Sequence, residues 1–440
     1  MRKLLFSLCV LLCAYSAAAL DRQPGADYHA RREALAKKAG GVVVLLAPLE
    51  RMDAVYEFRQ EDSFYYLSGV TVPGAGLLVA PPIEAKGDSP ARAYTEILFL
   101  PPRNLRLEKY TGPQLGGDDP EAPKVTGFDR VEDMSKLPEE VAKLLANQSP
   151  VVYTELPMQG SASASDDMLG FLRHSNAMVF FQDVTTILTS LRTVKDTGEI
   201  ALIRKAVDAS VAAHLAAMKA VKPNVKEYEV SAVMQYEWTR RGCERPSYAP
   251  IVGSGHNSTV LHYSEDAATM KAGDVVVIDA AAEYSMYAAD ITRTLPVNGH
   301  FTPRQKEIYD IVLGAQEAAM AAFQSGKSLL VGDSDASLNK VAKDYIKAHG
   351  KDLHGQPLDQ YFIHGLGHYI GLNVHDPGDY KTPLAPGMVF TMEPGIYIPE
   401  ENIGVRIEDD FLVGADGKLI KLSAALPSKA EDVERAMAAK

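Results

Sequence analysis

Apolar runs separated by polar stretches divide the first part of the chain into short elements. Four apolar runs have the length of buried strands: 41–47, 76–80, 95–100 and 150–153. The stretches 27–39 and 134–147 predict helices, whereas 101–130 is rich in Pro, Gly and Asp and predicts a loop. The pattern therefore predicts a mixed α/β domain at the front of the chain.

A helix-start signal marks a second domain. Asp196 precedes Glu199 by three residues, which is the spacing of a capping box, and Pro223 stops the helix that follows. Between them, apolar residues recur at helical spacing: Ile200, Ile203, Val207, Val211 and Met218. We therefore predict two domains, covering residues 22–185 and 190–430.

The second domain contains an internal repeat. KAGDVVVID and APGMVFTME share a glycine, an apolar strand and a terminal carboxylate, so Asp279 corresponds to Glu393. Earlier in each half GSGH resembles GLGH, and His262 corresponds to His375. Three correspondences in the same order predict two αβ halves related by a pseudo-two-fold axis. Such an axis would bring Asp279 and Glu393 to a common centre.

Two carboxylates end apolar segments within residues 273–292. Asp279 follows four consecutive β-branched residues, and Asp290 follows a second apolar run. If the chain turns at Tyr284–Ser285, the two aspartates face each other in a hairpin, with Cβ atoms about 4.5–5.5 Å apart. Like charges at that distance need a shared proton or a cation. A proton-sharing pair and a pair of surface carboxylates therefore stay open beside a metal site.

Further metal-ligating side chains follow in the second half. His364, His368 and His375 fall within twelve residues, in a chain that has only 11 histidines. Glu393 and Glu408 each follow an apolar strand. Four carboxylates with an imidazole suit a pair of hard or borderline divalent ions, such as Mn, Co or Zn. This cluster favours the metal site over the two alternatives.

Composition narrows the class of protein. The chain has 440 residues, of which 46% are hydrophobic, enough for two or three domains with their own cores. Its net charge of −12 argues against a nucleic-acid backbone or an anionic membrane as the main partner. Of the three cysteines, Cys9 and Cys13 lie near the N-terminus. The third, Cys243, is predicted to be a small buried hydrophobe.

The first 19 residues predict a secretory signal peptide. Arg2 and Lys3 precede an apolar run, and small residues place the cleavage site near Ala19–Leu20. A transmembrane anchor is the alternative, for which the apolar run is short. We therefore expect a protein exported to the periplasm or the extracellular space, without a stable membrane anchor after cleavage.

Five sequence motifs resemble those of the pita-bread metallopeptidases: IDAAAEY, ADITRT, HGLGHYIGLNVHD, TMEPGIY and VRIEDD. Within that family the aminopeptidase P and prolidase branch is the most similar. The front segments ERMDAVYEFRQEDSFYYLSGV and YTGPQLG resemble the N-terminal domain of aminopeptidase P. The resemblance covers roughly residues 28–425. It implies an α/β fold, with a mixed α/β creatinase-like domain followed by a C-terminal pita-bread domain.

The resemblance also implies a binuclear metal site with five ligands: Asp279, Asp290, His368, Glu393 and Glu408. Asp290 and Glu408 would bridge the two ions, and Asp279 would chelate one of them. His368 and Glu393 would complete the other. Manganese is the expected metal, and cobalt and zinc remain open.

The same resemblance implies catalytic roles. Glu393 would be the general base, and His262 and His375 would orient the substrate and stabilise charge on its carbonyl oxygen. His364 would lie beside the substrate or behind the ligands, and Arg406 would pair either with a ligand carboxylate or with a surface group. The implied substrate is a peptide with proline in second position, and the implied assembly is a homodimer or homotetramer.

Three other functions are alternatives to the one that the resemblance implies. An Xaa-Pro dipeptidase is the nearest alternative. A metal-free hydrolase of the creatinase type and a non-catalytic peptide-binding module share the fold, but the retained set of ligands argues against both.

Overall fold

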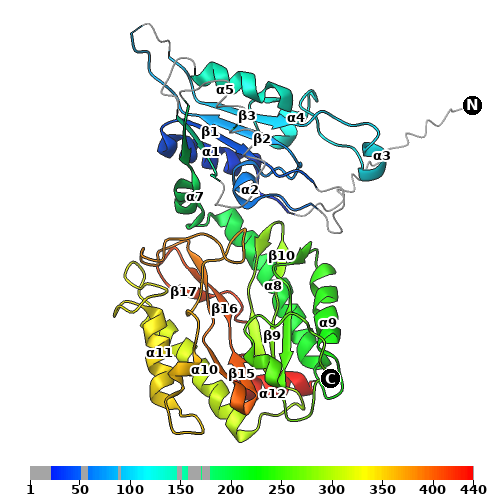
Figure 1. Cartoon of the computed structure of the whole chain (residues 1–440), viewed down its shortest axis with the longest axis vertical. Coiled ribbons are helices and arrows are strands. Elements are labelled where there is room, and N and C mark those ends of the chain that lie inside the picture. The colour runs from blue at the N-terminus through cyan, green and yellow to red at the C-terminus, as the bar shows by residue number, and fades with distance from the viewer. Residues whose placement is uncertain are drawn as a thin grey trace, which may run out of the picture.

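The computed structural model describes residues 21–50, 58–87, 91–145, 151–156, 170 and 179–439, which form two α/β domains placed end to end (Figure 1). The predicted signal peptide, residues 1–19, lies outside the described residues. Within the described ranges, no helix combines the length and the apolar character needed to cross a membrane.

The first domain is built on a mixed sheet with strand order β4-β3-β2-β1-β5-β6. The strands β1, β2 and β3 pair antiparallel, and the outer strands add in parallel. The bounds are β1 Val42–Leu46, β2 Gly76–Ala80, β3 Thr95–Leu100, β4 Val131–Asp133, β5 Val151–Thr154 and β6 Phe180–Asp183. The four predicted strands are confirmed to within one residue at each end.

Helices cover both faces of this sheet because alternate strand residues point to opposite sides. Helix α5 (Leu137–Leu145) packs on the face that carries Val42, Val44 and Leu78. Helices α1 (Gly25–Ala39) and α2 (Asp62–Ser68) pack on the other face. The predicted loop at 101–130 is partly wrong. It contains the single-turn helices α3 (Glu108–Thr111) and α4 (Ala122–Thr126), too short to give a periodic apolar pattern.

Helix α7 (Thr185–Arg192) leads into the second domain, whose first long helix is α8 (Thr197–Ala220). The predicted capping box is confirmed: the Asp196 carboxylate accepts from the Glu199 N–H at 2.8 Å, and the Glu199 carboxylate accepts from the Asp196 N–H at 3.0 Å. Cys243 follows the next helix, α9 (Glu227–Thr239), and is buried, as predicted. Burial raises the pKa of its thiol to about 12, which disfavours a nucleophilic role.

The second domain contains the same pairing of strands twice. One sheet has strand order β12-β9-β8 and another β13-β16-β17, and β9 pairs antiparallel with β12 as β13 does with β16. The equivalent glycines before β9 and β13, Gly273 and Gly387, both have positive φ, at 92° and 87°. Helices α8 and α9 accompany the first half, and α10 and α11 the second (Figure 1). The predicted repeat is confirmed for this strand pairing and for the glycine that precedes it.

The remaining elements of this domain have the following bounds: β7 Arg245–Pro246, β8 Ile251–Ser254, β9 Val275–Asp279, β10 Ala282–Tyr284, β11 Tyr287–Ala288, β12 Thr292–Pro296, α10 Pro303–Ala322, α11 Leu338–His349, β13 Val389–Met392, β14 Gly395–Ile398, β15 Ile403–Arg406, β16 Asp409–Val413, β17 Leu419–Lys421 and α12 Ala430–Ala438. The two halves are joined directly by a β-bridge between Thr292 and Glu408.

The predicted hairpin register is wrong by two residues. Asp279 faces Thr292, not Asp290, because the turn is centred on Ser285 and Met286, which have φ of 50° and 73°. These positive φ values place the turn one residue later than the apolar pattern indicated. A shift of two residues keeps a side chain on the same face, so Asp279 and Asp290 still point to one side of the hairpin.

Candidate metal centre and active site

The five predicted ligands meet where the two halves of the second domain join. Asp279 ends β9 and Asp290 precedes β12, whereas His368 lies in the loop before β13. Glu393 follows β13 directly, and Glu408 precedes β16. Their donor atoms form groups within 4.8 Å of one another: Asp279, Asp290 and Glu408; His368, Glu393 and Glu408; and Asp290, His368 and His375. Two adjacent ions that share carboxylates fit this arrangement.

One hydroxyl group lies between the two aspartates. The Tyr248 oxygen is 2.5 Å from Asp279 Oδ1 and 2.6 Å from Asp290 Oδ1, and both aspartates are buried. Burial and the two aspartates raise the pKa of Tyr248 well above 10, so the hydroxyl keeps its hydrogen. One hydrogen can serve only one of the two carboxylates. The Oδ1 atom of the other carboxylate is then left facing the hydroxyl oxygen without a hydrogen, an arrangement that a cation between the two aspartates would stabilise.

The two glutamates show the same shortage of positive charge. Glu408 is 1% exposed; its Oε2 accepts from the Thr292 hydroxyl at 2.7 Å, whereas its Oε1 has no hydrogen-bond partner among the described residues. Burial and the nearby Asp290 raise the pKa of Glu408 well above its ordinary value. Burial likewise raises the pKa of Glu393 to about 8, despite the opposing effect of His368. Bound divalent cations would supply the missing charge.

The His368 ring is oriented for ligation. Its Nδ1 lies 3.1 Å from the Tyr369 carbonyl oxygen, which leaves Nε2 facing Asp290 and Glu393 at 3.4 Å from each. Burial lowers the pKa of His368, but Asp290 and Glu393 outweigh this and raise it to about 9. The ring therefore holds a proton at the position where a cation would sit, and a metal ion would replace that proton.

Arg406 orients a ligand carboxylate. It is 3% exposed, its Nη2 donates to Asp279 Oδ2 at 2.6 Å, and its Nη1 donates to the Tyr397 hydroxyl at 2.8 Å. Its Nε lies 3.2 Å from Thr292 Oγ1. Of the two predicted roles for Arg406, the structure supports pairing with a ligand carboxylate and contradicts a surface ion pair.

The other predicted histidines surround the ligands. His364 Nε2 lies 2.8 Å from the Tyr397 hydroxyl, and burial lowers the pKa of His364 to about 4. The His375 ring contacts the His368 ring edge-on, with centroids 4.4 Å apart. His262 is exposed and follows Leu261, whose carbonyl oxygen lies 3.4 Å from Arg406 Nη2, the same nitrogen that donates to Asp279. The structure therefore brings all three to the ligand set, and His375 also falls within one ligand-forming group.

Several supporting residues were not predicted from the sequence. Tyr248 gave no signal, and Gln316 is one buried polar residue on α10. Gln316 Nε2 donates to the carbonyl oxygen of Met392, the residue before Glu393, at 2.9 Å and to Asp409 Oδ2 at 3.0 Å. Gln316 therefore holds the backbone next to Glu393 in place.

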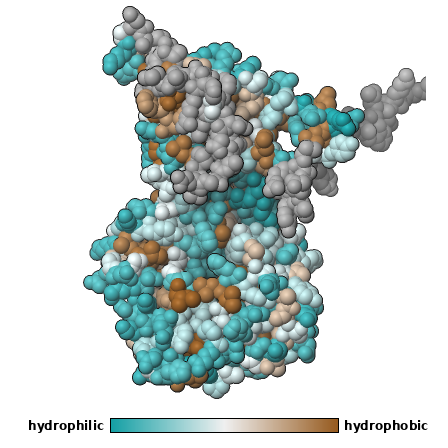
Figure 2. Space-filling model, in the orientation of Figure 1, coloured by the Kyte–Doolittle hydropathy of each residue, from teal (hydrophilic) through white to brown (hydrophobic). Residues whose placement is uncertain are grey.

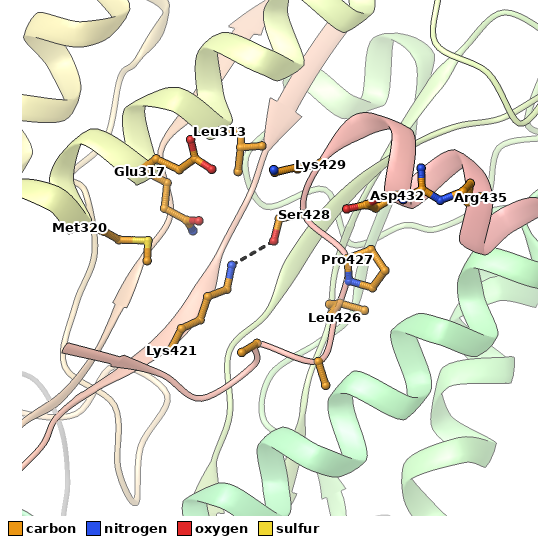
Figure 3. A pocket seen from close by; sticks show the side chains of 13 residues that line it. Leu313, Glu317, Met320, Lys421, Leu426, Pro427, Ser428, Lys429, Asp432 and Arg435 are labelled. Carbon is orange, nitrogen blue, oxygen red and sulfur yellow. Dashed lines mark hydrogen bonds and ion pairs between the residues drawn. The ribbon is translucent and has the colours of Figure 1, made fainter. Parts of the chain in front are cut away.

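Arg293 holds the second glutamate in a similar way. Its Nη1 donates to the Glu408 carbonyl oxygen at 2.8 Å and its Nη2 to Asp409 Oδ1 at 2.7 Å. Lys421 pairs with Asp409 Oδ2 at 2.7 Å, and its Nζ also donates to Ser428 Oγ. Lys421 and Ser428 line a groove of about 510 Å³ between α10 and α12 (Figure 3). This buried network stabilises the strand ends that present the ligands.

Comparison with known proteins defines the class. The family model "Metallopeptidase family M24" matches residues 201–415, and "Aminopeptidase P, N-terminal domain" matches residues 28–153. The chain belongs to metallopeptidase family M24, with the aminopeptidase-P-type domain in front. The predicted α/β fold with a C-terminal pita-bread domain is thereby confirmed.

Individual relatives match almost the whole chain. The Xaa-Pro aminopeptidase of Escherichia coli (strain K12) is 34% identical over 444 residues, covering 94% of this chain and 98% of the relative. The solved structure of aminopeptidase P from E. coli with the inhibitor Pro-Leu is 32% identical, with a TM-score of 0.82 and coverage of 95% and 99%. Zn-substituted E. coli aminopeptidase P in complex with product is 31% identical, with a TM-score of 0.81 and the same coverage.

The Thr292 hydroxyl offers a test of the ligand support. Because it donates to Glu408 and lies beside Arg406 Nε, Thr292→Val leaves Glu408 Oε2 without that donor. Loss of a group that orients a ligand typically costs about 10–100-fold in metal affinity. We expect Thr292→Val to weaken binding of at least one Mn²⁺ ion by about tenfold, measured by equilibrium dialysis with metal analysis.

Thr294→Val is the matched control. Thr294 lies two residues further along β12, is also fully buried, and bonds the Arg406 backbone but no ligand side chain. It should change metal affinity less than threefold. Equal weakening in both variants would contradict a specific role of the Thr292 hydroxyl.

Proposed function

We propose that this protein releases the N-terminal residue from peptides with proline in second position, as a metal-dependent exopeptidase. The observation that carries the proposal is the convergence of four carboxylates, three of them buried, and His368 beside three further histidines. Similarity over nearly the whole length to a protein named Xaa-Pro aminopeptidase supports the substrate class.

We propose two divalent ions as the cofactor, with manganese as the native metal and cobalt or zinc as alternatives. Oxygen and nitrogen donors without a thiolate support hard or borderline ions, and a zinc-substituted structure of a relative keeps zinc open. Asp279, Asp290, His368, Glu393 and Glu408 would hold the ions, and the carboxylates of Asp290 and Glu408 each belong to two of the three donor groups.

When bound, the ions supply Lewis acidity, which polarises the scissile carbonyl and acidifies the attacking water. Glu393, whose carboxylate lies 3.4 Å from His368 Nε2 among the proposed ligands, takes the proton from that water and passes it to the departing proline nitrogen. His262 and His375 orient the peptide and donate to the carbonyl oxygen as negative charge develops on it. His364 stays neutral near neutral pH and borders the substrate together with Tyr397.

A substrate-length series tests this proposal. We expect kcat/KM for an Xaa-Pro-Yaa tripeptide to exceed that for the Xaa-Pro dipeptide by at least about tenfold, measured by chromatography of the released amino acid. The matched Xaa-Ala-Yaa peptide should be cleaved at least about tenfold more slowly, because the site is proposed to accept a tertiary amide and its ring. Preference for the dipeptide would instead establish the prolidase alternative, and absence of cleavage in the metal-loaded protein would reject both.

Two further properties belong to the proposal. Residues 1–19 support export to the periplasm or the extracellular space, which cell fractionation with detection of the mature N-terminus would test. A homodimer or homotetramer is proposed from the family resemblance, and light scattering of the purified protein would test it. No nucleic acid is proposed as a partner, given the net charge of −12.

A further inference from the structure

The segment 372–376, which carries His375, is held by charged residues from outside its own half of the domain. Asp376 is 4% exposed and accepts from Arg192 Nη2 at 2.6 Å and from Lys195 Nζ at 2.9 Å. Burial acts to raise the pKa of Asp376, but the two cations outweigh it and hold the pKa below its ordinary value. Asp376, the residue after His375, is therefore a buried carboxylate that is paired with two cations.

The N-terminal domain reaches the same segment through α2. Asp62, the first residue of α2, accepts from Asn373 Nδ2 at 3.0 Å and lies 3.5 Å from Arg192 Nη2. The neighbouring Ser63 hydroxyl oxygen accepts from Arg192 Nη1 at 3.2 Å. Arg59 Nη1 donates to Asp62 Oδ1 at 2.6 Å, and Arg59 Nη2 donates to the Leu372 carbonyl oxygen at 2.6 Å.

These contacts continue to the catalytic histidine itself. The Asn373 side-chain oxygen accepts from the backbone N–H of His375 at 3.0 Å. Asp376 Oδ1 accepts from the backbone N–H of Asn373 at 3.2 Å. The segment has no helix or strand within it, so its geometry depends on such contacts. Helix α2 lies on the side of the first domain that faces the second (Figure 1), and the described surface at their boundary is mainly hydrophilic in this view (Figure 2).

We propose that the N-terminal domain positions the His375 imidazole, with Asp62 and Arg59 acting on segment 372–376 directly and through Arg192. This inference rests on the proposed function, in which His375 orients the peptide. A displacement of about 1 Å in a reacting group can cost about 100-fold in rate, so a contact made from another domain can affect turnover strongly. Asp62 is thus a positioning residue for the reaction, in addition to holding the domains together.

A second contact between the domains provides a matched control. Arg31 of α1 pairs with Asp196 at 2.5 Å and with Glu199 at 3.5 Å, at the start of α8. Both pairs cross the same boundary, and Arg31 is as buried as Arg192. Arg31→Lys keeps the charge and removes the forked geometry, so it weakens a domain contact that does not end on segment 372–376.

The test is a double-mutant cycle on the full-length, metal-loaded protein with an Xaa-Pro-Yaa tripeptide. We expect Asp62→Asn to lower kcat by about 5–20-fold with KM within about twofold of wild type. In a His375→Ala background the same change should cost less than about twofold, because the group it positions is gone. Arg31→Lys should leave kcat within about twofold. A kcat of Asp62→Asn within twofold of wild type, or equal losses in both backgrounds, would overturn the proposal.

A second readout does not depend on activity. In the zinc-loaded protein with ¹⁵N-labelled histidine, the His375 ring resonances can be assigned by their loss in His375→Ala. They should shift in Asp62→Asn and stay unchanged in Arg31→Lys, and unchanged resonances in Asp62→Asn would reject the positioning role. If wild-type protein fails to cleave prolyl peptides, the proposed function fails while this measurement still decides the position of His375.

Discussion

Glu393→Gln is expected to lower kcat for an Xaa-Pro-Yaa peptide by roughly 10³–10⁴-fold while the protein stays folded. Glutamine keeps the shape of glutamate and an oxygen that can bind a cation, but it cannot take a proton from water. Glu393 follows β13 directly, and its carboxylate lies 3.4 Å from His368 Nε2, so it reaches the place where the attacking water is proposed to bind. Steady-state kinetics at saturating peptide and Mn²⁺ measures the effect.

Metal content must be determined in the same preparation, because Glu393 is also a proposed ligand. A variant that holds both ions and still hydrolyses the peptide within about tenfold of wild type would exclude Glu393 as the base. A variant that loses metal would show that ligation dominates, and its kcat would then be measured at increasing Mn²⁺ until the site is filled.

Removing the metal should lower activity at least about 100-fold and make stability depend on pH in a defined direction. Without cations, the folded state holds protons on Glu393, whose pKa is raised to about 8, and on His368, whose pKa is raised to about 9. A group with a raised pKa stabilises the fold while it is protonated, and that contribution is lost as the pH rises through the folded-state pKa. The melting temperature of metal-free protein should therefore fall between about pH 6 and 9.

The metal-loaded protein is the control for this measurement. Its melting temperature should fall less over the same range, since bound cations replace the protons and bind only the folded state. Calorimetric titration in buffers of different ionisation enthalpy should show proton release on Mn²⁺ binding. Full activity after chelation to less than a tenth of an ion per chain would contradict the proposed cofactor.

The sequence predicted the ligands of the centre better than it predicted their support. Asp279 and Glu393 could be paired because the repeat places matching glycines and strands before them, and the structure puts them in two donor groups that share Glu408. Tyr248 could not be found, because a single tyrosine in an irregular segment has no period and no partner in the sequence. Its contacts with two aspartates exist only after the chain has folded.

The fold was predicted where a local pattern determined it. Strands β2 and β3 were placed to the residue because burial on both faces requires continuous apolar runs. The hairpin register was missed because Ser285 and Met286 adopt positive φ without the Asn or Gly that normally signals such a turn. Short helices such as α3 were missed because a single turn is too brief for amphipathic spacing to appear.

The division of the ligands between the two halves imposes an order on biosynthesis. Asp279 and Asp290 come from the first half, and His368, Glu393 and Glu408 come from the second. A ribosome-bound chain that ends before residue 408 lacks a carboxylate that both proposed ions would share. We therefore expect the full pair of ions to bind only after the second half has been synthesised and the two halves have docked.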